Sequence, residues 1–334
     1  MTNKMENSDF SNEGIILLLG VTGAGKSFFL NQLKQGSAVE GHTLHSETSE
    51  CSAVRIFLDD EKERTITVVD TPGFDDTEKP AGEVLAEITS FLAAQHSVGM
   101  PLRGVLYLHK ISDNRMTGSS MKYLRLLKSL VGDDALQNVI FVTTMWNKLR
   151  DEDKVEALRR EQELINDFWE PMVQKGAFLA PFDGTRGSAF SLVYQLSGKD
   201  SVVLNVQREL VDQELSVLET GAGTNLLHQL EEDVRTYRQE AMALESQIEE
   251  ERKKVPQNKD EIRRLKDTKA RVDEILAKFQ SSIAHMETKP GPGFRQQLRE
   301  LMKARGAEAL GGAVAILSAM LNLTVFVVHL TTGF

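Results

Sequence analysis

Short apolar runs and helical patterns alternate along the first two thirds of the chain. Residues 15–19 form an apolar run that ends at a glycine-rich turn, and residues 28–33 follow a helical pattern. Two further apolar runs, at 104–108 and 139–143, are typical of buried parallel strands and enclose a helical pattern at 121–131. This alternation predicts βαβ crossovers and therefore an α/β fold with a mainly parallel sheet.

Between these runs the pattern also predicts an antiparallel hairpin. Two β-rich segments, at roughly 51–58 and 64–70, are separated by a short acidic stretch that is typical of a turn. The alternation closes with a last strand at 177–179 and a helix that starts at Ser188. The α/β domain is therefore predicted to span residues 14–220.

The sequence beyond this domain is long, charged and poor in proline. Its apolar residues recur at steps of three and four, which is the spacing of a heptad seam, and the seam resumes after Pro256. Residues 221–288 are therefore predicted to form a helical hairpin or coiled coil, whose simplest interpretation is a charged stalk without chemistry. The segment Lys289-Pro290-Gly291-Pro292-Gly293 is expected to break the helix, so residues 289–310 are interpreted as a linker with a basic amphipathic segment.

The two ends of the chain differ in polarity. Residues 1–13 are polar and are expected to be a disordered leader, because a signal peptide would need a basic region followed by an apolar run. Residues 311–330 are almost wholly apolar and follow basic residues, so as a helix they would just span a hydrocarbon core of roughly 30 Å. Asn322 and His329 are costly in lipid. A helix packed on the protein and an interfacial or oligomeric contact are therefore the competing interpretations of this candidate anchor.

Composition and charge narrow the classes of function. The 334 residues are 41% hydrophobic and 26% charged, which suffices for one sizeable core and an appendage. The formal net charge of −10 argues against a nucleic-acid partner. Cys51 is the only cysteine, so the chain can form neither an intrachain disulfide nor a multi-cysteine metal cluster. The expected compartment is the cytoplasm.

The glycine-rich turn after the first apolar run carries the first candidate chemistry. It reads Gly20-Val21-Thr22-Gly23-Ala24-Gly25-Lys26-Ser27 and matches the pattern G-x-x-x-x-G-K-S. In such a loop the glycines let backbone N–H groups point inward, the lysine neutralises the β- and γ-phosphates, and the serine hydroxyl ligates Mg²⁺. The flanking strand and helix are the context that the motif requires. The predicted nucleotide-binding residues are Gly20, Thr22, Gly23, Ala24, Gly25, Lys26, Ser27 and Phe28.

A second motif, Asp70-Thr71-Pro72-Gly73, follows the second strand of the predicted hairpin. Its carboxylate would emerge at the carboxyl edge of the sheet, where α/β folds bind ligands, and would reach Mg²⁺ through a water. The Gly73 N–H is expected to meet a γ-phosphate oxygen. A threonine that reaches Mg²⁺ and γ-phosphate only in the triphosphate state is also needed, and Thr48 is preferred over Thr43. The predicted catalytic set is Lys26, Thr48 and Gly73, and the predicted metal set is Ser27, Thr48 and Asp70.

These motifs resemble the septin-like and AIG1 (IMAP)-like branch of P-loop GTPases. The likeness is greatest to fungal G-domain proteins with an Asp-Thr-Pro-Gly-Phe motif and a Thr-Thr-Met-Trp segment, and it covers roughly residues 14–220. The segment from His109 to Arg115 also looks like that branch. The resemblance implies GTP or GDP with Mg²⁺ as ligands. It also implies that Thr144 and Asn147 recognise the base and that Ser188 and Ala189 form the last nucleotide motif.

Two positions depart from this pattern. The guanine-reading position usually holds an aspartate, which has two acceptor oxygens, whereas the Asn147 side chain offers only one. Loss of one charge-assisted hydrogen bond is expected to weaken guanine preference by about 1.5–3 kcal/mol, and a shifted Asn147-Lys148 pair is the alternative. Phe74 stands where many GTPases place a glutamine that orients the attacking water. We therefore expect slow intrinsic hydrolysis, completed by a partner or by dimerisation.

The sequence as a whole predicts a GTP-binding protein that hydrolyses Mg-GTP slowly to GDP as a switch. Expected partners are a second copy, through the G domain or the coiled coil, and a membrane, through residues 311–330 of a cytoplasmic, tail-anchored protein. One alternative is a nucleotide-dependent scaffolding protein, septin-like in its assembly at a membrane, in which hydrolysis is incidental. The other alternative is an ATP-using P-loop enzyme.

Overall fold

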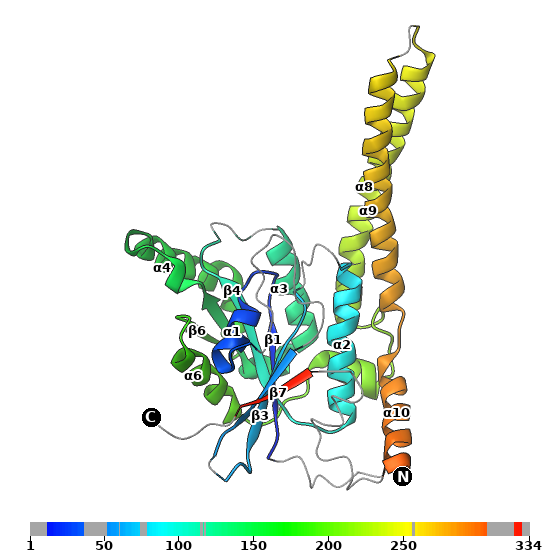
Figure 1. Cartoon of the computed structure of the whole chain (residues 1–334). Coiled ribbons are helices and arrows are strands. Elements are labelled where there is room, and N and C mark those ends of the chain that lie inside the picture. Colours follow the sequence, from blue (N-terminus) through cyan, green and yellow to red (C-terminus); the bar gives the residue numbers. More distant parts are fainter. Residues whose placement is uncertain are drawn as a thin grey trace.

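The computed structural model shows a seven-stranded sheet with helices on both faces and a long helical hairpin that rises from one side (Figure 1). The strand order is β6-β5-β4-β1-β3-β2-β7. The structure describes residues 12–36, 52–59, 61–73, 79–113, 116, 118–255, 258–305 and 324–328. This arrangement confirms the predicted α/β fold with a mainly parallel sheet and a helical region after it.

The strands of the α/β domain follow the apolar runs of the sequence. They are β1 (Ile15–Leu19), β2 (Ser52–Phe57), β3 (Thr65–Asp70), β4 (Leu102–Lys110), β5 (Val139–Thr144) and β6 (Phe178–Pro181). β1 pairs in parallel with β3 and β4, whereas β2 runs antiparallel to β3 and completes the predicted hairpin. Every residue of β1, β3 and β5 is buried. Burial on both faces explains why these strands are continuously apolar rather than alternating.

Two hydrophobic cores lie on opposite faces of the sheet. On one face, α1 (Lys26–Leu33) and α6 (Arg186–Ser197) pack on Ile16 and Leu18. On the other face, α2 (Ala81–Ser97) and α3 (Gly118–Val131) pack on Leu17 and its neighbours. Both layers therefore hold the end of β1, from which the glycine-rich loop begins.

Several short helices connect the larger elements. They are η1 (Asp133–Asn138), η2 (Trp146–Lys148), η3 (Asp151–Asp153), α4 (Lys154–Glu163), the π-helix η4 (Leu164–Trp169), α5 (Glu170–Val173), α7 (Asn205–Gln207) and the π-helix η5 (Arg208–Asp212). Two of them, α7 and η5, pack on α2. Trp169 is fully buried and stacks on Phe141 of β5, with ring centroids 4.9 Å apart. This aromatic contact fixes the segment between β5 and β6 on the sheet.

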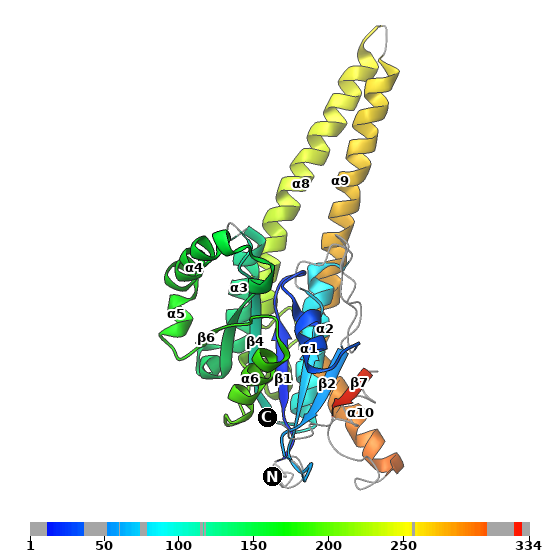
Figure 2. The ribbon, with the colours of Figure 1, turned by 60° about the vertical axis from the view of Figure 1, so that its left-hand side comes forward.

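The helical hairpin consists of α8 (Gly221–Lys253) and α9 (Lys259–Met286), which run side by side away from the sheet (Figures 1 and 2). Both helices lie within the segment for which a hairpin was predicted. Their seam buries Ala241, Leu244 and Val272. We call these two helices the stalk, and the end of the stalk next to the sheet its root.

The segment after the stalk differs from the prediction. Residues from Pro290 to Arg305 form α10, although the proline and glycine residues at its start were expected to break the helix. The difference has a local cause, because proline is well suited to the first turn of a helix, where its missing N–H group is not needed. Pro290 and Pro292 both lie in that turn. α10 packs against α2, so this segment is a docked helix and not a linker.

The apolar end of the chain also differs from the prediction. Thr324–Val328 form β7, which pairs in parallel with β2 and places Thr324 opposite Ser52. The expected helix over 311–330 is thus wrong for these five residues, and the other residues of that range lie outside the described part. Threonine, valine and phenylalanine favour strands, and the outer edge of β2 offers backbone groups for pairing. Among the helices that the structure describes, none combines the length and the apolarity needed to cross a membrane.

The predicted leader is likewise in contact with the domain at its end. The Asn12 carbonyl accepts a hydrogen bond from the Thr65 N–H at 2.7 Å, and Glu13 forms an ion pair with Arg55 of β2 at 2.7 Å. Residues 1–11 lie outside the described residues. The last two residues of the predicted disordered leader are therefore ordered against the hairpin.

Candidate functional site

The glycine-rich loop joins the buried end of β1 to α1 in a conformation that needs glycine. Gly20 has a φ of 148°, and a Cβ atom there would lie 2.5 Å from the Leu108 carbonyl oxygen of the neighbouring strand. Gly25 has a φ of 95° and precedes the first residue of α1. Gly23 has a φ of 76° and no atom within 4 Å of its missing side chain. The loop is thus tight against the sheet at one end and open at Gly23.

Lys26 extends back over this loop. Its side chain is only 7% exposed, and its Nζ atom donates to the carbonyls of Gly20 at 3.0 Å and Val21 at 3.2 Å. A buried ammonium group held by neutral carbonyls lies at the point where the loop also directs the N–H groups of the first helical turn. This is the charge that a phosphate group needs.

Two other predicted residues of the loop have a packing role in the structure. The Ala24 side chain is fully buried in the core, and its N–H donates to the Val21 carbonyl at 3.1 Å. Phe28 packs on Phe182, with ring centroids 6.0 Å apart. Both side chains pack in the core, so Phe28 would have to contact a ligand through its backbone N–H.

Ser27 and Asp70 bring the two phosphate motifs together. The Ser27 hydroxyl donates to Asp70 Oδ2 at 2.8 Å. Asp70 is fully buried, and its Oδ1 atom has no hydrogen-bond partner among the described residues. Burial raises the pKa of Asp70, and the Lys26 charge and the Ser27 hydrogen bond act in the opposite direction. A hydroxyl beside a buried carboxylate is an oxygen-only ligand set, so these residues fit a magnesium ion, which Ser27 and Asp70 would hold.

Gly73 lies directly on the glycine-rich loop. A Cβ atom at Gly73 would be 2.3 Å from Thr22 Oγ1 and 2.7 Å from the Thr22 nitrogen, so only glycine fits here. The preceding Thr71 hydroxyl donates to the Leu18 carbonyl of β1 at 2.8 Å and fixes this turn to the sheet. Thr48, the predicted switch threonine, and Phe74 lie outside the described residues.

The turn after β5 is tied to the same loop. The Thr144 hydroxyl donates to the Ala24 carbonyl at 2.7 Å. Met145 then adopts a φ of 67°, which is uncommon for a residue other than glycine, and η2 carries Asn147. The Asn147 side chain lies against Gly184, where a Cβ atom would be 2.5 Å from Asn147 Nδ2. The loop after β6 therefore closes beside Asn147.

The last predicted motif, Ser188 and Ala189, lies at the start of α6. In the first turn of this helix the Ser188 N–H donates to the Thr185 hydroxyl at 3.2 Å. Ala189 is fully buried, and its N–H donates to the Thr185 carbonyl at 3.1 Å. The Ala189 side chain therefore packs in the core, because α6 needs an apolar face toward the sheet, and its contact with a nucleotide stays a prediction.

The residues beside Asn147 are instead Asp183 and Gly184, which the sequence reading missed. Asp183 Oδ1 accepts from the Thr185 N–H at 2.8 Å and from the Thr185 hydroxyl at 2.7 Å. These hydrogen bonds lower the pKa of Asp183. The signal in the sequence is Asp-Gly directly after a strand, which is typical of a tight turn.

His109 lies beneath the turn after β5. Its side chain is 2% exposed and meets Trp169 edge to face, with ring centroids 5.9 Å apart. Burial lowers the pKa of His109, and its Nδ1 atom has no hydrogen-bond partner among the described residues. His109 is therefore a neutral packing residue behind Thr144, whose hydroxyl also contacts the His109 carbonyl at 3.4 Å. Arg115, at the other end of the predicted segment, lies outside the described residues.

Comparison with known proteins identifies an AIG1-like region. Residues 15–173 match the AIG1 family, so the matched region begins with β1 and contains both phosphate motifs and Asn147. The AIG1-like part of the predicted resemblance is thereby confirmed, whereas its septin-like and fungal parts stay predictions.

The chain is also similar to solved structures at low identity. One is Toc33 from Arabidopsis thaliana in complex with GDP and Mg²⁺, at 16% identity and a TM-score of 0.46, covering 57% of this chain and 88% of that chain. A second is Toc33 from the same plant with Mg²⁺ and GMPPNP, at 19% identity and a TM-score of 0.41, covering 52% and 72%. A third is a bacterial selenocysteine-specific elongation factor, at 15% identity and a TM-score of 0.34, covering 54% and 27%.

Proposed function

We propose, from the AIG1-like character of residues 15–173, that this protein binds Mg-GTP and hydrolyses it slowly to GDP as a switch. The observation that carries the proposal is the 2.8 Å hydrogen bond between Ser27 and Asp70, which are 43 positions apart in the sequence. It joins the glycine-rich loop to the end of β3. A hydroxyl from the first motif and a carboxylate from the second are the two protein groups that a magnesium ion beside a triphosphate requires.

Each element of the phosphate end has a role in this proposal. Lys26, already buried inside the loop, neutralises the β- and γ-phosphates. Gly73 offers its N–H to a γ-phosphate oxygen, which its position on Thr22 favours. Thr48 would add its hydroxyl in the triphosphate state. Loss of the γ-phosphate then removes the contacts that hold the Thr48 and Gly73 segments, which is how nucleotide switches change state.

The base end of the proposed site is formed by Asn147 and the loop with Asp183 and Gly184. Asn147 lies against Gly184, close to the Thr144 turn that contacts the glycine-rich loop. One amide oxygen can accept from guanine, and the amide can also donate. We therefore propose GTP as the preferred nucleotide, with a weaker preference over other bases than an aspartate would give.

Slow turnover follows from Phe74, because an apolar side chain cannot orient an attacking water. The missing group would come from a partner or from a second copy of this chain, through the G domain or through α8 and α9. We place the protein in the cytoplasm, in keeping with its single cysteine.

Nucleotide competition on the purified full chain tests the proposal. We expect GTP to displace a fluorescent guanine nucleotide more tightly than ATP or XTP does, and binding to require Mg²⁺. Phosphate release per molecule is expected to be slow and to rise with protein concentration if a second copy supplies a catalytic group. Tight ATP binding without GTP binding would overturn the proposal in favour of an ATP-using enzyme.

A second function is favoured by the stalk, whose seam buries only a few apolar residues and whose surface is charged. A nucleotide-dependent scaffolding protein would bind GTP and assemble, with incidental hydrolysis. Light scattering in the presence of GTP or GDP separates the two functions. Nucleotide-dependent assembly without measurable turnover would support the scaffold.

A further inference from the structure

Helix α2 crosses the root of the stalk at Gly82. A Cβ atom at this position would lie 2.0 Å from the carbonyl oxygen of Ser282 in α9, and 2.5 Å and 2.8 Å from its carbonyl carbon and Cα. These are backbone atoms, which cannot rotate away as the end of a flexible side chain could. Ser282 itself is 2% exposed. The two helices therefore touch backbone to backbone, and only glycine allows this approach.

The two stalk helices pack chiefly on different helices of the α/β domain, α9 on α2 and α8 on α3, with a smaller contact between α2 and α8. The root of α9 shares one hydrophobic core with α2, through Met286 and Leu85. The root of α8 is attached to α3, where Asp233 forms an ion pair with Lys122 at 3.1 Å. Figure 2 shows α8 and α9 apart at the root, with α2 beside α9. A displacement of α2 would therefore act mainly on α9, with which it has the larger contact.

Only a short stretch separates this crossing from the phosphate end of the site. Gly82 follows Gly73 by nine positions in the sequence, and α2 begins at Ala81. Gly73 contacts Thr22 of the glycine-rich loop as closely as Gly82 contacts Ser282. Both ends of the stretch are thus fixed by contacts that a side chain would prevent. Gly73 is therefore joined to α2 by a short covalent route.

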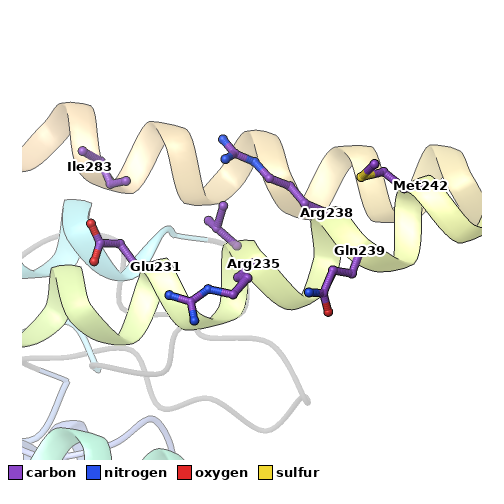
Figure 3. Close-up of a pocket in the computed structure, with 7 residues that line it drawn as sticks. Glu231, Arg235, Arg238, Gln239, Met242 and Ile283 are labelled. Carbon is purple, nitrogen blue, oxygen red and sulfur yellow. The ribbon is translucent and has the colours of Figure 1, made fainter.

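A shift of α9 would alter a groove at the stalk root. The groove has a volume of about 580 Å³, and Figure 3 shows it between the two helices. Ile283 of α9, next to Ser282, forms one side, whereas Val234, Arg235, Arg238 and Met242 come from α8. Because its two sides belong to different helices, a shift of α9 against α8 changes the shape of this groove.

We propose that the Gly82–Ser282 crossing couples the nucleotide site to the stalk. Gain or loss of the γ-phosphate moves Gly73, α2 transmits the displacement, and α9 shifts against α8 at the groove. This inference rests on the proposed function and deepens it, because it assigns the moving part of the switch. It also gives the stalk a role in reporting the nucleotide state.

Hydrogen exchange on the full chain tests this coupling. We expect the amides of residues 276–288 to exchange at rates that differ by at least about threefold between GDP and a non-hydrolysable GTP analogue. In the G82A variant this difference should disappear, while peptides from the glycine-rich loop keep their nucleotide-dependent protection. The matched control is Gly118→Ala at the start of α3, where the added Cβ meets nothing within 4 Å. This control should behave as the wild type does.

The outcomes separate the coupling from the proposed function. If the glycine-rich loop is protected by nucleotide but residues 276–288 of the wild type do not respond, the coupling is wrong and nucleotide binding stands. If no nucleotide protects the loop, both fail. A wild-type response that survives in the G82A variant would also overturn the role of this crossing. Because the wild-type comparison decides by itself, the test holds even if the G82A variant does not fold.

Discussion

The phosphate end and the base end of the candidate site are built in different ways. At the phosphate end, Lys26 and Asp70 are buried and Gly73 lies against backbone atoms of Thr22. At the base end, Asn147 and Asp183 are exposed on turns. In the proposed function, the contacts that every nucleoside triphosphate shares are thus part of the folded core, whereas those that select a base depend on exposed residues. The phosphate end should therefore be the more sensitive of the two to substitution.

The largest effect is expected from Lys26→Met. Removal of the buried ammonium group should weaken binding of both GTP and inorganic tripolyphosphate at least about 100-fold, which corresponds to about 2.8 kcal/mol. Isothermal titration calorimetry of both ligands measures this. Because Lys26 Nζ donates to the Gly20 and Val21 carbonyls, thermal unfolding of the nucleotide-free variant serves as the control for folding. If the variant bound tripolyphosphate within about threefold of the wild-type affinity, the glycine-rich loop would not be the phosphate-binding site.

The next effect should be confined to the base end. Asn147→Asp supplies a second acceptor oxygen, so GTP should gain roughly 10- to 100-fold over ATP, or about 1.5–3 kcal/mol. Tripolyphosphate affinity should not change, since the exposed Asn147 side chain lies against Gly184 and tripolyphosphate carries no base. Competition binding measures both quantities. The control variant is Arg150→Asp, which places a carboxylate where a shifted Asn147-Lys148 pair would need it. A gain there but not at position 147 would favour the shifted pair.

The same difference explains what could be predicted from the sequence. The glycine-rich loop is contiguous, and its strand and helix flank it directly, so its geometry follows from local pattern. The Asn147–Gly184 contact joins residues 37 positions apart, and no local pattern determines it. The burial of Ala189 likewise could not be predicted, because the motif gave its position in the sequence but not the face of α6 that it occupies.

Outside the site, tertiary context decided one element, and a second was missed although its local pattern is present. Apolarity over 311–330 predicted a helix, but Thr324–Val328 pair with β2, and the available edge strand is visible only once the sheet is formed. Helix α2 was not assigned from the sequence, although Val84, Leu85 and Ile88 follow helical spacing and are fully buried.

A smaller effect is expected at Gly184. Its φ of 89° disfavours any side chain. A Cβ atom would also lie 2.5 Å from Asn147 Nδ2, so the Asn147 side chain would have to move. Gly184→Ala should therefore weaken GTP binding roughly 5- to 30-fold, or about 1–2 kcal/mol, and leave tripolyphosphate binding unchanged. Gly36→Ala is the matched control, because Gly36 has a φ of 75° and nothing within 4 Å. Equal losses in the two variants would show that backbone strain, and not the Asn147 contact, is responsible.

The smallest expected effect is a pH dependence of thermal stability that arises at the base end. His109 lies behind Thr144 at the base end, and burial lowers the pKa of its imidazole in the folded protein. Its neutral form therefore stabilises the fold above the ordinary histidine pKa of about 6.5, and that contribution is lost as pH falls below this value. Between about pH 7.5 and about pH 5.5, the melting temperature of His109→Gln should fall less than that of the wild type, by a difference on the order of 2 °C. The control is His228→Gln, whose parent side chain is 74% exposed on α8 and should leave the wild-type slope unchanged. Equal slopes for all three proteins would mean that proton uptake at His109 does not oppose folding, and the base end would then be no more sensitive to acid than the rest of the domain.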